Sequence, residues 1–295
     1  MVSMNILDRE RRAHVIRCLV EGNSIRATVR LTGVAKNTVV KLLVEIGDAC
    51  AKYQDAKLRN LTCRRIQCDE IWSFCYAKAK NVPADKRGQF GYGDVWTWTA
   101  LCADTKLIAS WMVGGRDSGT AHAFIQDLAN CVSKKIQLTT DGHRVYLDAV
   151  ESAFGSEIDY AMLVKLYGED PKADTKYSPS QVIGAHSVVI TGNPKPRHIS
   201  TSFVERQNLT MRMSMRRFTR LTNGFSKKAH NHSAALALYF MYYNFCRVHQ
   251  TLRVTPAMEA GVADHVWNIE EVIALMNATT AKLGLRGPYK KKNSN

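Results

Sequence analysis

The order of predicted elements between residues 64 and 141 constrains the fold of this chain more than any other feature. "RRIQCDEIWSFCYAK" is rich in Ile, Trp, Phe and Tyr, which predicts a strand. "DVWTWTALCAD" and "KLIASWMVGG" form a predicted hairpin about Asp104-Thr105. "TAHAFIQDLANCV" has the periodicity of an amphipathic helix, and "KIQLTTD" is another predicted strand. The order is therefore three strands, one helix and a fourth strand.

This order matches the first half of a ribonuclease-H-like sheet, in which the first and fourth strands lie side by side. Asp69 lies within the first strand and Asp141 ends the fourth, so the two carboxylates are expected to be neighbours. Charge inside a buried strand is unfavourable unless it is paired or bound to metal. Asp141 taken alone fits the start of a helix equally well. Periodicity does not decide whether Asp69 or the adjacent Glu70 faces the site.

A third carboxylate is predicted in "ISTSFVERQNLTMRMSMRRFTRL", which has helical periodicity over residues 199–221. Glu205 shares a helical face with Arg212 and Arg216. It could therefore bind a metal ion at the scissile phosphate while these arginines bind the flanking DNA phosphates. Ser202-x-x-Glu205 also fits a capping box, in which the glutamate binds a backbone amide. The arginines expected to contact DNA are Arg206, Arg212, Arg216, Arg217 and Arg220.

The first fifty residues predict three short helices. A helix ends near Glu21-Gly22-Asn23, Ser24 can cap "SIRATVRLT", and Gly33 precedes "KNTVVKLLVEI". This pattern is typical of a helix-turn-helix, although a plain three-helix bundle with a solvated polar face also fits. The residues expected to meet DNA, at the start of the third helix and one turn further on, are Lys36, Asn37, Thr38 and Lys41.

The charge balance favours a polyanionic partner. Lys and Arg exceed Asp and Glu by 41 − 26 = 15, and the excess is spread along the chain. Nucleic acid is the commonest such partner, and no long apolar stretch suggests a membrane. The eight cysteines lack the paired spacing of a zinc site, so buried reduced thiols are expected. The charged N-terminus carries no signal core, which predicts a cytoplasmic, nucleoid-associated protein.

Four stretches resemble bacterial DDE transposases of the insertion-sequence-one family: "CDEIW", "TTDGH", "ISTSFVERQNLTMRMSMRRFTRLTNGFSKK" and "YYNFCRVHQTLRVTPAMEAG". The resemblance runs from about Asp69 to Trp267. It implies a ribonuclease-H-like fold and a metal site carried by Asp69, Asp141 and Glu205. Members of this family often carry an N-terminal cysteine cluster, which Cys18 and Cys50 cannot supply here. Recognition of the element ends is therefore expected to rest on the helix-turn-helix.

Together these features predict an α/β protein with an all-α helix-turn-helix domain and a ribonuclease-H-like mixed-sheet domain. The expected divisions are residues 1–50 for DNA binding, 51–64 for a linker, 65–267 for catalysis with an irregular insertion at 165–200, and 268–295 for a C-terminal helix and basic tail.

The expected activity is transposition. The protein would bind the ends of an insertion element, cut double-stranded DNA and join the 3′-hydroxyls to a target with two Mg²⁺ ions per site, for which Mn²⁺ would substitute. A homodimer or higher oligomer on DNA is expected. His143 and His249 are further candidates for DNA contact. The alternatives are a metal-dependent nuclease or resolvase on the same fold, and a DNA-binding regulator without catalysis.

Overall fold

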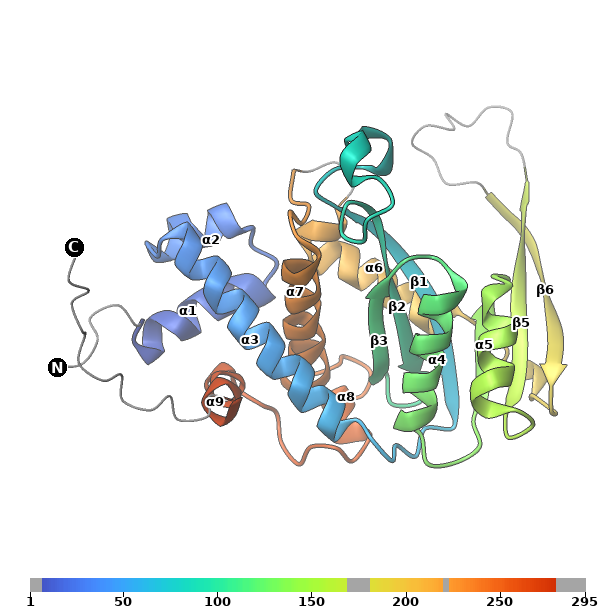
Figure 1. Ribbon diagram of the computed structural model, residues 1–295. Helices are drawn as coiled ribbons and strands as arrows, with labels where there is room; N and C mark the ends of the chain where they lie inside the picture. The colour runs from blue at the N-terminus through green and yellow to red at the C-terminus, as the bar shows by residue number, and fades with distance from the viewer. Residues whose placement is uncertain (1–6, 169–180, 220–222, 280–295) are drawn as a thin grey trace, which may run out of the picture.

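A six-stranded mixed sheet forms the centre of the protein, in the order β3-β2-β1-β4-β5-β6. The computed structural model describes residues 7–168, 181–219 and 223–279 (Figure 1). The strands are β1 Arg65–Cys75, β2 Gly93–Cys102, β3 Ile108–Gly114, β4 Gln137–Asp141, β5 Asp159–Gly168 and β6 Gln181–Thr191. β1 pairs antiparallel with β2 and parallel with β4, β5 runs parallel to β4, and β6 runs antiparallel to β5. The predicted adjacency of the first and fourth strands is confirmed, and Cys68 lies opposite Thr140 in their register.

Helices cover both faces of this sheet. α4 (Ser118–Cys131) and α5 (Val145–Phe154) lie side by side on one face (Figure 1). α6 (Ser202–Ser214) contacts β1 and β2 on the other face. Because residues alternate between the two faces along a strand, neighbouring residues of β1 point toward different helices.

The N-terminal helices are α1 Arg9–Val20, α2 Ile25–Thr32 and α3 Lys36–Lys57. Ser24 caps α2 by accepting a hydrogen bond from the Ala27 amide (3.1 Å), as its place in the sequence predicts. Gly33 has φ +67°, a left-handed conformation that glycine adopts without strain, and it turns the chain into α3. α3 is longer than the pattern predicts, since it continues to Lys57 into the segment expected to be a linker.

α3 joins the N-terminal helices to the rest of the protein. It packs along α7 (Ala229–Met241) and also contacts α9 (Ile269–Thr279). The approach to α7 requires a glycine, because a Cβ atom on Gly47 would lie 2.4 Å from the Ala234 carbonyl oxygen. The core is therefore continuous between the N-terminal helices and the sheet.

Two segments differ from their predicted structure. Residues 165–200 are expected from the sequence to be irregular apart from one short strand candidate, "HSVVITG". In the described part of this segment, β5 continues to Gly168 and β6 covers most of the strand candidate and begins earlier, at Gln181. The helix predicted over 199–221 ends at Ser214, because Met215 adopts an extended backbone that turns its side chain into the core beside Phe218. The shorter elements are η1 Ala79–Asn81, η2 Ala84–Lys86, η3 Pro196–His198, η4 Arg216–Phe218, η5 Tyr242–Cys246 and α8 Pro256–Glu259.

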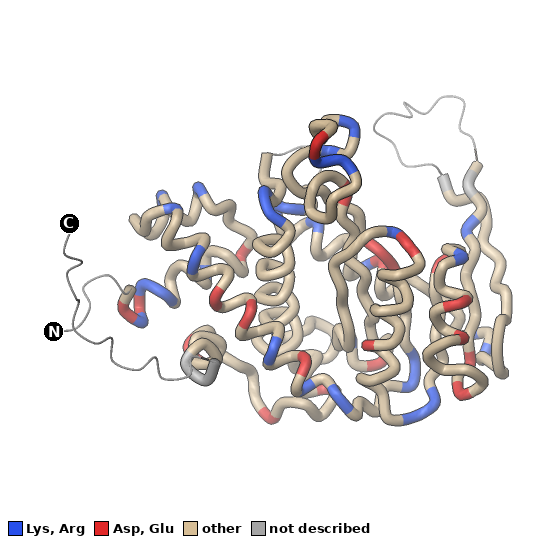
Figure 2. Tube along the Cα trace, in the orientation of Figure 1, with Lys and Arg blue, Asp and Glu red and all other residues tan. Residues whose placement is uncertain are grey.

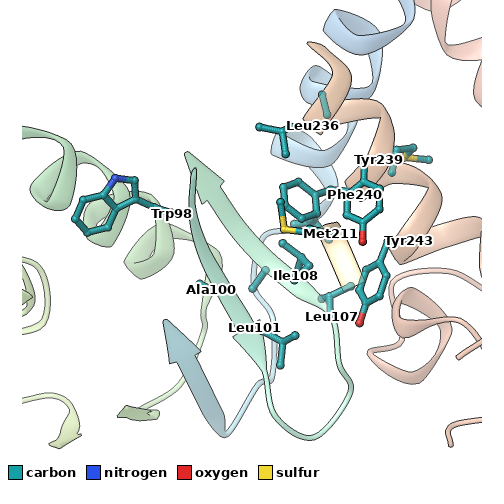
Figure 3. Close-up of a cluster of buried hydrophobic side chains, with 14 of the residues drawn as sticks. Trp98, Ala100, Leu101, Leu107, Ile108, Met211, Leu236, Tyr239, Phe240 and Tyr243 are labelled. Carbon is teal, nitrogen blue, oxygen red and sulfur yellow. The ribbon is translucent and has the colours of Figure 1, made fainter. Parts of the chain in front are cut away.

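The hydrophobic core lies where β2 and β3 meet α6 and α7. Figure 3 shows Ile108, Met211 and Phe240 gathered at this junction, and all three are fully buried. Seven of the eight cysteines are buried and the eighth, Cys246, is partly exposed. In the described part of the chain, every helix is too short or too polar to traverse a lipid bilayer.

Candidate active site

Three carboxylates meet where β4 ends against β1. Asp69, Glu70 and Asp141 each place one oxygen within 4.8 Å of the others. Asp69 and Glu70 are adjacent in β1 and start toward opposite faces of the sheet. Asp141 is the last residue of β4, and β1 extends beyond it, so at this point side chains from either face can approach. The structure therefore brings Asp69 and Asp141 together as predicted, and it adds Glu70.

A residue of α6 orients the Asp69 side chain. The Asn208 side-chain amide donates a hydrogen bond to Asp69 Oδ2 (2.8 Å), and the Glu70 backbone amide donates to Oδ1 (2.9 Å). Burial, followed by the charges of Asp141 and Glu70, raises the pKa of Asp69 to about 7. A cation bound between these carboxylates would stabilise their ionised forms and so oppose this rise.

Glu70 is almost fully enclosed, with a side chain only 1% exposed. Arg116 donates from Nε to its Oε2 (3.3 Å), but Oε1 is buried without a hydrogen-bond partner among the described residues. The Tyr146 hydroxyl lies beside this carboxylate without hydrogen-bonding geometry. Burial and the charge of Asp141 raise the pKa of Glu70 to about 7. A buried carboxylate oxygen without a donor is one that a metal ion could bind.

Arg116, in the loop between β3 and α4, is a residue that the sequence did not indicate. Its Nη2 lies 4.0 Å from Asp141 Oδ2, and its guanidinium stacks 4.7 Å from the Trp96 ring. It therefore bridges two of the three carboxylates. The residue follows an ordinary strand and glycine pair, so no motif in the sequence marks it.

Glu205 lies in the first turn of α6, which β1 holds in place. Gln67 Oε1 accepts hydrogen bonds from the amides of Phe203 (2.9 Å) and Val204 (3.1 Å), so Gln67 binds the free amides at the helix start. The capping box suggested by the sequence does not form. Glu205 accepts a hydrogen bond from the Thr201 hydroxyl and pairs with Lys165 Nζ at 2.5 Å.

Glu205 is outside the 4.8 Å group of carboxylates, yet it is close to it. Its charge is among the causes that raise the pKa of Asp69. The third predicted carboxylate thus lies near Asp69 on α6, where it forms an ion pair with Lys165.

The two candidate histidines lie in different places. The His143 amide donates to Asp141 Oδ1 (3.0 Å), and its Nε2 is buried without a partner among the described residues. Burial lowers the pKa of the His143 imidazole, which favours the neutral ring beside the acidic cluster. His249 instead contacts Thr251 and lies near Lys106, in the turn between β2 and β3.

The residues predicted to bind DNA differ in exposure. Lys36 and Asn37 are exposed at the start of α3, Thr38 is half-buried, and Lys41 is exposed but pairs with Glu45 at 3.7 Å. Figure 2 shows Lys and Arg spread over the N-terminal helices and the sheet region alike.

The arginines of the Glu205 segment also differ. Arg206 on α6 and Arg216 on η4 are exposed, and Arg212 is half-buried. Arg217 donates to Ser226 Oγ (2.6 Å), and burial lowers its pKa to about 10, so its guanidinium is engaged inside the protein. Arg220 lies outside the described residues.

A cavity of about 780 Å³ opens at the other end of β1, next to Arg64 and Asp104. None of the clustered carboxylates lines it. The acidic cluster is the better candidate for chemistry, because its groups have the properties that a metal site needs.

A scan of protein-family models and a search of curated proteins found no match for this sequence. The structure is similar to a piggyBac transposase in a synaptic complex with hairpin DNA, at 10% identity and a TM-score of 0.39, over 96% of this chain and 76% of that chain. It is also similar to a Mos1 transposase in a paired-end complex with the left transposon end, at 11% identity and a TM-score of 0.21, over 52% and 59% of the two chains. Similarities this low do not assign the chain to a family.

Proposed function

We propose that this protein is a DDE transposase that binds the ends of an insertion element, cleaves the DNA and joins its 3′-hydroxyl ends to target DNA. The observation that carries the proposal is the acidic cluster. Asp69 and Asp141 meet at neighbouring parallel strands, Glu70 belongs to the same cluster, and the Glu205 carboxylate is close by on α6. In this proposal the sheet and its helices form a ribonuclease-H-like catalytic domain.

The donor set fits a hard divalent cation. Carboxylate oxygens are the ligands that Mg²⁺ and Mn²⁺ prefer, and Asp69 and Asp141 place oxygens within 4.8 Å of each other, where burial and their mutual charge raise the pKa of Asp69 to about 7. Asp69, Asp141 and Glu205 are the proposed ligands. Bound Mg²⁺, two ions per site, would stabilise the attacking and leaving oxygens of an in-line phosphoryl transfer.

Neighbouring residues have positioning roles in this proposal. Asn208 fixes the rotamer of Asp69, and Gln67 fixes the start of α6 and thus the place of Glu205. Lys165 positions Glu205 through their ion pair, and Glu205 would have to leave this pair to bind a cation. Arg116 balances the charge of Glu70, which otherwise repels Asp141 in a buried setting.

The N-terminal helices are the proposed recognition unit for the element ends. The formal net charge of +15 suits a polyanion, and Lys36 and Asn37 project from the exposed start of α3. The proposed division is a DNA-binding unit of residues 1–50 and a catalytic domain of residues 65–267. Residues 51–64, proposed as a linker, include the end of α3, which packs against α7. The proposed partner is double-stranded DNA in the bacterial nucleoid.

Replacing Lys36 and Asn37 together with Ala in the full-length protein is expected to weaken binding to the element end about tenfold or more. The reason is that each good base contact contributes about 1–3 kcal/mol. Fluorescence anisotropy with fragments from both flanks of the protein's own gene measures the change. Lys57→Ala, at the far end of the same helix, is the control and should bind as the wild type does. Equal affinity of the double variant and the wild type would move recognition away from α3.

The proposed activity is tested by incubating the protein with Mg²⁺, those flanking fragments and a supercoiled plasmid. Fragments joined to the plasmid through their 3′ ends support transposition. Cleavage without joining would indicate a nuclease or resolvase, and binding without either product would indicate a regulator.

A further inference from the structure

β6 is an edge strand of the described sheet. It pairs with β5 on one side, and none of the other described strands pairs with its outer side (Figure 1). The outer side of such a strand presents backbone amides and carbonyls that another strand can bind. Its pairing with β5 is regular from Gly184 to Val189, and the register irregularities lie at either end of this stretch. The middle of the strand therefore has the regular backbone pairing of an extended strand, which a partner could continue.

The composition of β6 is unusual for an exposed edge. Soluble proteins commonly protect edge strands with Lys, Pro or inward-pointing charges. "QVIGAHSVVIT" contains no Asp, Glu, Lys, Arg or Pro, in a chain that is 23% charged. Its large apolar side chains are nevertheless exposed to solvent: Val182, Ile183, Val188, Val189 and Ile190. This combination is typical of a surface that another protein strand covers.

We propose that β6 pairs antiparallel with β6 of a second copy of this chain, with the two-fold axis at His186. The proposal does not depend on the proposed catalytic function. An isologous contact requires a surface that complements itself. In an antiparallel pair related by a two-fold axis perpendicular to the sheet, one residue lies opposite its own copy.

His186 is the position about which the strand is most nearly symmetric. Val182 would face Ile190 of the second copy, Ile183 would face Val189, and Gly184 would face Val188. Apolar residues therefore meet apolar residues on both sides of the axis, and small residues flank it. Such cross-strand pairs stabilise a sheet, and none of them brings like charges together. The two sheets would join into one continuous sheet.

DNA is the less suitable occupant of this edge. β6 carries no cation for a phosphate backbone. Lys165, on the adjacent strand β5, is already paired with Glu205 on the face that carries α6. A second uncharged strand satisfies both the open backbone groups and the apolar side chains.

Sedimentation velocity of the full-length protein, without DNA, tests the pairing. The wild type is expected to show a concentration-dependent dimer in the micromolar range. His186→Lys and His186→Glu should each raise the dimer dissociation constant at least about tenfold, because each places like charges directly opposite one another. Mixing the two variants should restore a dimer, since opposite charges then meet. Val266→Lys, which adds a charge to an exposed apolar position elsewhere, should dimerise as the wild type does.

The restored dimer in the mixture also shows that both variants are folded. A wild type that stays monomeric at all concentrations would overturn the proposal, as would charged variants that dimerise normally. If His186→Lys instead strengthened DNA binding by a monomeric protein, the edge would be assigned to DNA.

Disulfide formation tests the register independently. His186→Cys places the introduced thiols opposite one another, so oxidation should link two chains. Val182→Cys is the matched control on the same strand, because its partner would be Ile190 and not its own copy. The wild-type protein measures how much disulfide cross-linking arises from Cys246, the one partly exposed native cysteine. Equal cross-linking of both variants, or none in His186→Cys, would exclude an axis at His186.

Discussion

Asp69→Asn, Asp141→Asn and Glu205→Gln are each expected to reduce DNA cleavage and joining at least about a thousandfold, which corresponds to about 4 kcal/mol of transition-state stabilisation. Each change removes a negative charge from a proposed metal ligand while preserving the shape of the side chain. Affinity for the element end should change no more than a few-fold, because the N-terminal helices are the proposed recognition unit. Strand-transfer assays with Mg²⁺ measure activity, and anisotropy measures binding.

Glu70→Gln distinguishes the role of Glu70 from that of Asp69, its neighbour in β1. In the structure Glu70 is held by Arg116, whereas Asp69 is held by Asn208 on the side that faces Glu205. The loss of activity should therefore be much smaller for Glu70→Gln than for Asp69→Asn. Equal losses would place Glu70 among the metal ligands.

A control outside the cluster is available on α5, where Glu151 is exposed. Glu151→Gln removes the same charge and should leave the activity unchanged. Near-full strand transfer by any of the three ligand variants would remove that residue from the proposed site.

Strand order was the part of the fold that could be predicted from the sequence. Three strands, a helix and a fourth strand leave few ways to build one sheet, because connections between parallel strands are short and right-handed. The pairing of β1 with β4, and with it the approach of Asp69 to Asp141, follows from that order. These two residues come together although the patterns of either segment alone fit other structures.

The parts that could not be predicted depend on tertiary contacts. Periodicity cannot show that Glu70 reaches the same cluster, since it depends on β4 ending at Asp141. The helical pattern of the Glu205 segment continues past Ser214, but burial of Met215 and Phe218 ends α6 there. Arg216 consequently lies on η4, and the predicted face that it shares with Glu205 on one helix does not exist.

The ion pairs of the site likewise could not be predicted from the sequence. Arg116 precedes α4 and Lys165 lies on β5, yet both contact the acidic residues. Long charged side chains reach several ångströms from their backbone, so neither spacing nor composition indicates where their charges lie.

In metal-free buffer, the contribution of Asp69 and Glu70 to the free energy of unfolding is expected to fall as the pH rises from about 4 to about 7. Burial and neighbouring charges raise the pKa of Asp69 from 3.8 to about 7 and that of Glu70 from 4.5 to about 7. Across this window these two carboxyl groups hold protons in the folded protein that the unfolded chain has released, so their contribution favours unfolding as the pH rises. The combined loss is on the order of a few kcal/mol.

Mg²⁺ should reverse this loss where the carboxylates are ionised. A ligand that binds only the folded state adds about 2.7 kcal/mol at one hundred times its dissociation constant. Thermal unfolding in EDTA and in millimolar Mg²⁺, at pH 5 and pH 8, should therefore show a larger Mg²⁺-dependent rise of Tm at pH 8. At pH 5 a proton occupies Asp69, one of the proposed ligands, and competes with the cation.

Asp69→Asn distinguishes the effect of the acidic cluster on stability from the effects of the other titrating groups of the protein. The variant lacks one of the repelling charges, so in EDTA at pH 8 it should be more stable than the wild type. At pH 4, where Asp69 of the folded protein is protonated, the two proteins should differ much less. The rise of Tm with Mg²⁺ should be largely lost in the variant. The same Mg²⁺-dependent rise in both proteins would mean that the cation binds elsewhere, because a site built on Asp69 cannot lose this carboxylate without losing affinity.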